Sequence, residues 1–236
     1  PDAAGRPRVP IKGRGAASSV PGRFAVTTAL EVDDGWDAQD GEEFGPSRPR
    51  TVVSAETARS IISRNSSPDV GFSQSVNPYR GCEHGCIYCF ARPSHAYLDL
   101  SPGLDFETRI FAKHNAAALL RAELARPSYV CSPIALGINT DAYQPAERRL
   151  GISRACLEVL ADAGHPVSFV TKAALIERDI DVLAAMARRH LVTVHFSVTT
   201  LDNRLAAKME PRAAAPHARL RAMRALHEAG IPVGVL

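Results

Sequence analysis

The chain has 236 residues, of which 45% are hydrophobic, and a formal net charge of +3 at pH 7. This length allows one large domain or two small ones, and the apolar content suffices for a substantial core. The basic and acidic residues are scattered, so the charge does not argue for a nucleic-acid partner. The sequence contains no apolar run of about eighteen residues, which excludes a spanning helix, and its five cysteines are too few for a secreted disulfide scaffold.

The N-terminal part differs in composition from the rest of the chain. Residues 1–50 are rich in Pro, Gly, Ser, Asp and Arg without a sustained period, which predicts a disordered or extended segment. Isolated arginines in such a segment, Arg14 and Arg23, are expected to be solvated. Residues 51–70 are predicted to be a short helical lead-in, with a helix around 54–64 that begins at a Ser54 cap and a turn over 64–69.

From residue 71 onward, strand and helix patterns alternate, and we assign residues 71–236 to one core domain. Such alternation predicts a parallel sheet covered by helices, either doubly wound or curving like a barrel. Because the sequence stops inside its fifth predicted strand, we expect the chain to be a fragment. Strands are predicted at 71–77, 133–138, 167–171, 192–198 and 231–236, and helices at 116–125, 147–163, 176–187 and 218–229.

Polar residues follow successive predicted strands. Ligands of parallel α/β sheets gather at the carboxyl ends of the strands, so these residues are expected to line one site. They are a cysteine-rich loop after the first strand, Asn139-Thr140-Asp141 after the second, Lys172 after the third, and Thr199-Thr200 after the fourth.

The cysteine-rich loop carries the most specific signal. Cys82, Cys86 and Cys89 have the spacing Cys-x3-Cys-x2-Cys, and no fourth cysteine lies nearby. A cubane iron–sulfur cluster normally takes four thiolates, so three ligands leave one iron open. An open coordination site is where metal chemistry takes place.

This loop resembles the hallmark of the radical S-adenosylmethionine (radical SAM) superfamily, including an aromatic residue, Tyr88, before the third cysteine. The stretch from about Asn65 to Leu236 is similar to a bacterial family grouped with spore photoproduct lyase and often labelled DNA repair photolyase-like. The resemblance implies a partial (β/α)6 barrel, here truncated in the fifth strand. The matching segments are Asn77-Pro78-Tyr79-Arg80-Gly81-Cys82, Tyr88-Cys89-Phe90-Ala91-Arg92-Pro93, Asn139-Thr140-Asp141, Val170-Thr171-Lys172 and Glu210-Pro211-Arg212.

The resemblance also implies cofactors and roles. The three cysteines would bind a [4Fe-4S] cluster, and SAM would chelate the open iron and be cleaved reductively to a 5′-deoxyadenosyl radical. By position, the SAM contacts would be Tyr88, Asn139, Thr140, Asp141, Lys172 and Ser197. Where many members have a Gly-Gly-Glu-like turn, this chain reads Gly137-Ile138-Asn139, and Ile138 removes backbone freedom there.

The same resemblance implies an electron donor such as flavodoxin or ferredoxin and leaves the substrate open, with nucleic acid as one candidate. The absence of a signal layout and the reliance on free thiols predict a cytoplasmic protein that does not act at a membrane.

A non-catalytic metal-binding module is the alternative, with an electron-transfer cluster or a structural zinc completed by His84. The remaining thiols are not expected to bind the cluster. Cys131 lies before the second predicted strand, at the far end of the sheet, and Cys156 lies on an apolar helix face.

Overall fold

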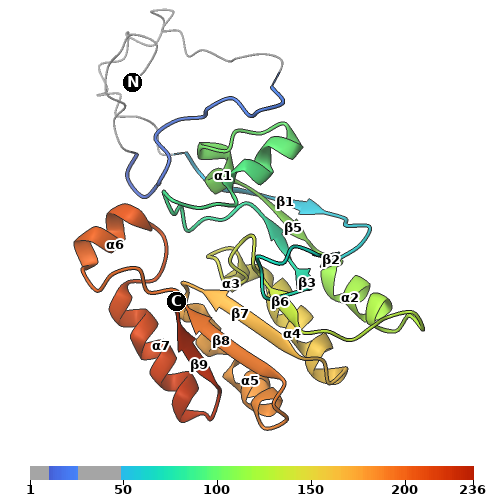
Figure 1. Ribbon diagram of the computed structural model, residues 1–236. Coiled ribbons are helices and arrows are strands. Elements are labelled where there is room, and N and C mark those ends of the chain that lie inside the picture. Colours follow the sequence, from blue (N-terminus) through green and yellow to red (C-terminus); the bar gives the residue numbers. More distant parts are fainter. Residues whose placement is uncertain (1–10, 26–48) are drawn as a thin grey trace, which may run out of the picture.

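The computed structural model describes residues 11–25 and 49–236, in which two sheets lie side by side (Figure 1). The larger sheet has six strands in the order β2-β3-β6-β7-β8-β9. The smaller has three, in the order β1-β5-β4. Residues 1–10 and 26–48, which hold most of the predicted N-terminal tail, lie outside the described residues.

The larger sheet confirms the prediction of a parallel α/β core. Its strand order follows the chain order, whereas a doubly wound sheet reverses direction at a switch point, so the arrangement agrees with the barrel-like alternative. β2 alone is antiparallel to its neighbour. The strands are β2 (Ile62–Arg64), β3 (Gln74–Val76), β6 (Ile134–Leu136), β7 (Val167–Thr171), β8 (Val192–Phe196) and β9 (Val233–Val235).

Helices connect and cover these strands, and their apolar faces form the core with fully buried side chains such as Leu157, Leu183 and Leu226. The helix predicted over 147–163 is divided in two, because Gly151 adopts a left-handed conformation with φ of 65°. No helix in the described parts of the chain is long and apolar enough to cross a membrane. The helices are α2 (Ala116–Leu124), α3 (Glu147–Leu150), α4 (Ile152–Asp162), η3 (Ala174–Asp179), α5 (Ile180–Ala187), α6 (Asn203–Met209) and α7 (Pro216–Glu228).

The smaller sheet corrects the prediction for residues 51–70. The helix expected around 54–64 is wrong: this stretch holds β1 (Val52–Glu56) and β2. β1 pairs in parallel with β5 (Arg109–Lys113), which also pairs with β4 (Tyr79–Arg80). Pairing with a distant strand outweighed the local helix signal, as is common for short segments.

Two short helices, η2 (Arg92–Leu98) and α1 (Leu104–Thr108), lie between β4 and β5. They pack with residues 11–25, which run alongside them in Figure 1. Arg14 in this segment is 9% exposed, so the expectation that it is solvated is wrong.

Candidate functional site

The three cysteines lie in the loop that follows β4, at the carboxyl edge of the parallel sheet. Cys82 is buried, while Cys86 and Cys89 are partly exposed. The loop turns through Gly81 and Gly85, with φ of 77° and 68°. A Cβ on Gly81 would lie 2.9 Å from the Phe106 carbonyl oxygen, so glycine is needed for both conformation and space.

Polar side chains fix the backbone of this loop through hydrogen bonds. Gln144, fully buried, accepts a hydrogen bond from the Glu83 amide at 3.0 Å and donates to the Gly81 carbonyl at 3.1 Å. On the other side of the loop, the Arg92 guanidinium donates to the Cys86 carbonyl from Nε at 3.0 Å and from Nη2 at 2.8 Å. The backbone of the loop is therefore fixed by side chains that come from outside it.

Asp141 joins the loop to the ends of β6 and β7. Its carboxylate accepts hydrogen bonds from the Lys172 amide at 2.8 Å and from the Thr171 hydroxyl at 2.8 and 3.0 Å. His84 Nδ1 lies 3.4 Å from Oδ2, and the Tyr143 amide donates to Oδ1 at 2.8 Å. Although burial opposes ionisation, His84 and these donors hold the pKa of Asp141 below its usual value.

A second buried carboxylate, Glu210, joins the loop to the end of β8. It accepts hydrogen bonds from the Tyr88 hydroxyl and from the Thr199 hydroxyl, and it forms an ion pair with the buried Arg219. Lys172 Nζ lies 5.6 Å from the centroid of the Tyr88 ring, a cation–π distance. Thus the cysteine loop and the ends of β7 and β8 meet at one place.

The structure brings most of the predicted site residues to this edge, but their side chains differ in exposure and in their hydrogen bonds to the protein. Tyr88 is 46% exposed and Lys172 partly exposed. The Thr140 hydroxyl donates to the Tyr79 carbonyl at 3.0 Å, and Asp141 is saturated by protein donors, so both position the site. Contact of any of these residues with SAM stays a prediction.

Two further predicted residues are bound mainly through their backbones. The Asn139 amide donates to the Asn77 side chain at 2.9 Å, while its own side chain is exposed. The Ser197 amide donates to the Thr171 carbonyl at 3.0 Å, and its carbonyl accepts from Arg219 at 2.8 Å. The side chains of both residues stay available at the carboxyl edge.

The role of Cys82, Cys86 and Cys89 as cluster ligands stays a prediction. Within the described residues, no three His, Cys, Asp or Glu side chains are close enough to hold a single metal ion. Burial raises the pKa of Cys86 to about 12, which the charge of Lys172 opposes. Cys131 is exposed and Cys156 is fully buried in the core.

Several residues of the site escaped the sequence analysis. Gln144 and Arg219 carry no motif spacing, and only their burial marks them. Glu210 and Arg212 do not pair with each other: Glu210 pairs with Arg219, and Arg212 pairs with Glu83 at 2.9 Å. The sequence carried part of the evidence for these two residues, because Glu210-Pro211-Arg212 is one of the segments similar to the family.

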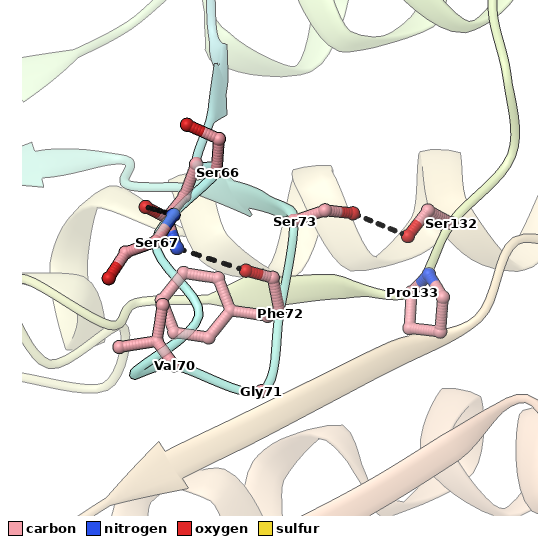
Figure 2. Close-up of a pocket in the computed structure, with 9 residues that line it drawn as sticks. Ser66, Ser67, Val70, Gly71, Phe72, Ser73, Ser132 and Pro133 are labelled. Atoms are coloured by element: carbon pink, nitrogen blue, oxygen red, sulfur yellow. Dashed lines mark hydrogen bonds between the residues drawn. The ribbon is translucent and has the colours of Figure 1, made fainter.

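A surface pocket lies at the opposite edge of the sheet, where β3 and β6 begin (Figure 2). Ser73 and Ser132 approach each other across it, with their hydroxyl oxygens 2.7 Å apart. Asn65 donates from its side chain to the Phe72 carbonyl at 3.2 Å. This pocket is separate from the cysteine loop, and its polar groups bind one another.

This chain is similar to a known protein family and to proteins from several organisms. The family model described as the radical SAM superfamily matches residues 76–236. Uncharacterized proteins from Mycobacterium tuberculosis and Mycobacterium bovis are 44% identical over 165 residues, which are 70% of this chain and 48% of theirs. A third, from Methanocaldococcus jannaschii, is 24% identical over 161 residues, 68% of this chain and 58% of its own. The chain thus spans about half the length of the mycobacterial relatives.

Among solved structures, a mutant of spore photoproduct lyase matches with a TM-score of 0.56 and 18% identity, covering 78% of this chain and 50% of that one. Spore photoproduct lyase complexed with dinucleoside spore photoproduct gives the same TM-score, identity and coverage. At this identity the likeness concerns the fold, which is a mixed α/β fold with a parallel sheet consistent with a radical SAM partial barrel.

Proposed function

Because the chain belongs to the radical SAM superfamily, we propose that it is the core of an enzyme that cleaves SAM reductively and abstracts hydrogen from a substrate. Cys82, Cys86 and Cys89 would hold a [4Fe-4S] cluster, with SAM at the open iron. The observation that carries this proposal is the meeting of the three-cysteine loop with the polar ends of β7 and β8. The whole protein would complete a partial (β/α)6 barrel.

The residues present fit such a cluster by their chemistry. Thiolates are the ligands of iron–sulfur clusters, and here one loop supplies three of them while the other thiols lie elsewhere. When bound, the cluster supplies the electron that cleaves SAM. The loop is fixed by Gln144 and Arg92, so its thiols are held at a defined place before any ligand arrives.

The other residues of the edge would bind and orient SAM. Tyr88 and Lys172 offer an aromatic face and an ammonium group beside the cysteines. Ser197 and Asn139 offer a hydroxyl and an amide at the ends of β8 and β6. Asp141, whose oxygens already have protein partners, would keep the loop and the β7 end together beside SAM.

For the substrate, we propose a nucleic acid as the first candidate. The support is the fold likeness to spore photoproduct lyase, one structure of which is complexed with dinucleoside spore photoproduct. The scattered charges add no support of their own. A flavodoxin or ferredoxin in the cytoplasm would supply the electron, because such a cluster and its free thiols need a reducing compartment.

The experiment that tests the proposal is anaerobic reconstitution of the chain with iron and sulfide. We expect an EPR signal of a reduced cluster that changes on addition of SAM, together with production of 5′-deoxyadenosine. Stoichiometric zinc without iron, or a cluster signal indifferent to SAM, would favour the non-catalytic metal-binding module instead. The full-length protein serves as the control for activity.

A further inference from the structure

Glu107, on α1, is a fully buried carboxylate that no part of the proposed function uses. Its oxygens accept hydrogen bonds from the Gly15 amide at 3.0 Å and the Ala16 amide at 2.8 Å. It also pairs with Arg92 Nη2 at 2.5 Å. A buried carboxylate is stable only when paired and hydrogen-bonded in this way, so the three donors are required as a set.

Arg92 carries this arrangement to the cysteine loop. Besides its two hydrogen bonds to the Cys86 carbonyl, its Nη1 donates to the Gly103 carbonyl at 3.1 Å. A guanidinium presents its donors in a rigid fork, and here the fork links a cysteine backbone to a buried carboxylate. Two side chains, Arg92 and Glu107, therefore connect the backbone of Cys86 to the backbone of Gly15 and Ala16.

Gly15 and Ala16 belong to residues 11–25, which we call the strap. The strap lies outside the part of the chain that matches the superfamily model, yet it is bound along its length and runs beside α1 in Figure 1. The Leu104 amide donates to the Ser18 carbonyl at 3.2 Å, and the Ser101 hydroxyl donates to the Val20 carbonyl at 2.7 Å. Arg14 donates to the Glu107 carbonyl at 2.9 Å.

The strap also touches the cysteine loop directly. A Cβ on Gly15 would lie 1.8 Å from the carbonyl oxygen of Gly85, the residue before Cys86, so the two backbones are in contact there. Likewise, a Cβ on Gly103 would lie 2.2 Å from the Ser18 carbonyl oxygen. Neither glycine has a positive φ, so each is needed for space alone.

We propose that Glu107 and Arg92 are positioning residues that couple the strap to the cysteine loop, so that the strap fixes the Cys86 backbone and limits solvent access to the cluster. The proposal rests on the proposed function, since it concerns the same cluster. The reduction potential of an iron–sulfur cluster depends on nearby charge, hydrogen bonding and solvent exposure. All three change at Cys86 if the strap is released.

Gly15→Ala and Gly103→Ala release the strap from its two sides without changing any charge. Gly71→Ala is the matched control, because a Cβ there meets nothing within 4 Å. In the metal-free chain, we expect hydrogen exchange in residues 81–92 to be about tenfold faster in both variants, which corresponds to about 1.4 kcal/mol. Exchange unchanged from the control in both variants would overturn the coupling.

In the reconstituted chain, both variants should lose their cluster absorbance in air about tenfold faster than the control. This ratio again corresponds to about 1.4 kcal/mol. Equal bleaching would overturn the role in limiting solvent access. A further comparison uses Arg92→Lys and Arg92→Gln. The cluster in the neutral Gln variant should have a more negative midpoint potential than the cluster in the Lys variant. Equal potentials would contradict a role for the Arg92 charge. If the native chain binds no iron, the proposed function fails, while hydrogen exchange still decides the coupling.

Discussion

Asp141→Asn is the substitution that most directly tests how the site is held together. In the native chain, one Asp141 oxygen faces the Tyr143 amide and the Thr171 hydroxyl, and the other faces the Lys172 amide and His84. The amide nitrogen of Asn carries hydrogens, so whichever way it is turned, it points at groups that donate. The substitution therefore removes at least one hydrogen bond, whichever oxygen the nitrogen replaces. It also removes the negative charge from the hydrogen bonds that remain.

The size of the effect follows from burial. Hydrogen bonds to a charged group contribute about 1.5–3 kcal/mol each, and an unpaired buried donor costs a similar amount. One hydrogen bond removed and the others weakened by the loss of charge give a loss of about 3 kcal/mol or more. Since a whole domain is stable by only about 5–15 kcal/mol, this is a large fraction.

The assay is urea unfolding of the metal-free, reduced chain, read as a fall in the midpoint with an unchanged slope. The control is Asp162→Asn, because Asp162 pairs with Arg121 at the surface, where both side chains are more than half exposed. We expect the control to change stability by less than about 1 kcal/mol. A loss at Asp141 no larger than that of the control would refute the argument that this carboxylate joins the loop to the sheet.

Three further predictions follow from the same structure. Cys86→Ala should lose both the cluster and SAM cleavage, measured by iron content and 5′-deoxyadenosine, whereas Cys131→Ala, at an exposed thiol, should keep both; cluster retention by the first variant would contradict the ligand assignment. Gly137→Ala places a Cβ 2.7 Å from Ala142 at a φ of 77°, so it should destabilise by about 1–3 kcal/mol. Gly71→Ala should be neutral, and equal unfolding midpoints would argue against the tight turn. Burial lowers the pKa of His165, so the unfolded state takes up its proton first and stability should fall as pH drops below about 6.5. His165→Gln should lose this part of the pH dependence in urea unfolding at pH about 5 and about 7.5, and an unaltered dependence would exclude His165 as its source.

The sequence predicted the parallel core because β7, β8 and helices such as α2 and α7 are long enough to show their own periods. The β7 strand and α2 were found close to their true bounds, and so were the polar strand ends. The prediction of a helix over residues 54–64 is wrong because β1 is defined by pairing with residues far along the chain, with Val53 opposite Ile110. No local pattern carries that information.

The candidate site was predicted in the same uneven way. Residues with motif spacing, such as the three cysteines, were identified from the sequence. Residues that act by being buried were not: Arg14, predicted to be solvated, donates to the carbonyls of Glu107 and Pro49. An ordinary-looking arginine or glutamate acquires its role only from the tertiary structure that surrounds it.

In the proposed function, the three cysteines at the carboxyl edge of this sheet leave an iron open for SAM. EPR of the anaerobically reconstituted and reduced chain, recorded with and without SAM, is the decisive experiment. We predict a reduced-cluster signal whose g-values shift when SAM is added and which is absent from Cys86→Ala. A signal that is identical with and without SAM would contradict the claim, as would a chain that takes up zinc and no iron.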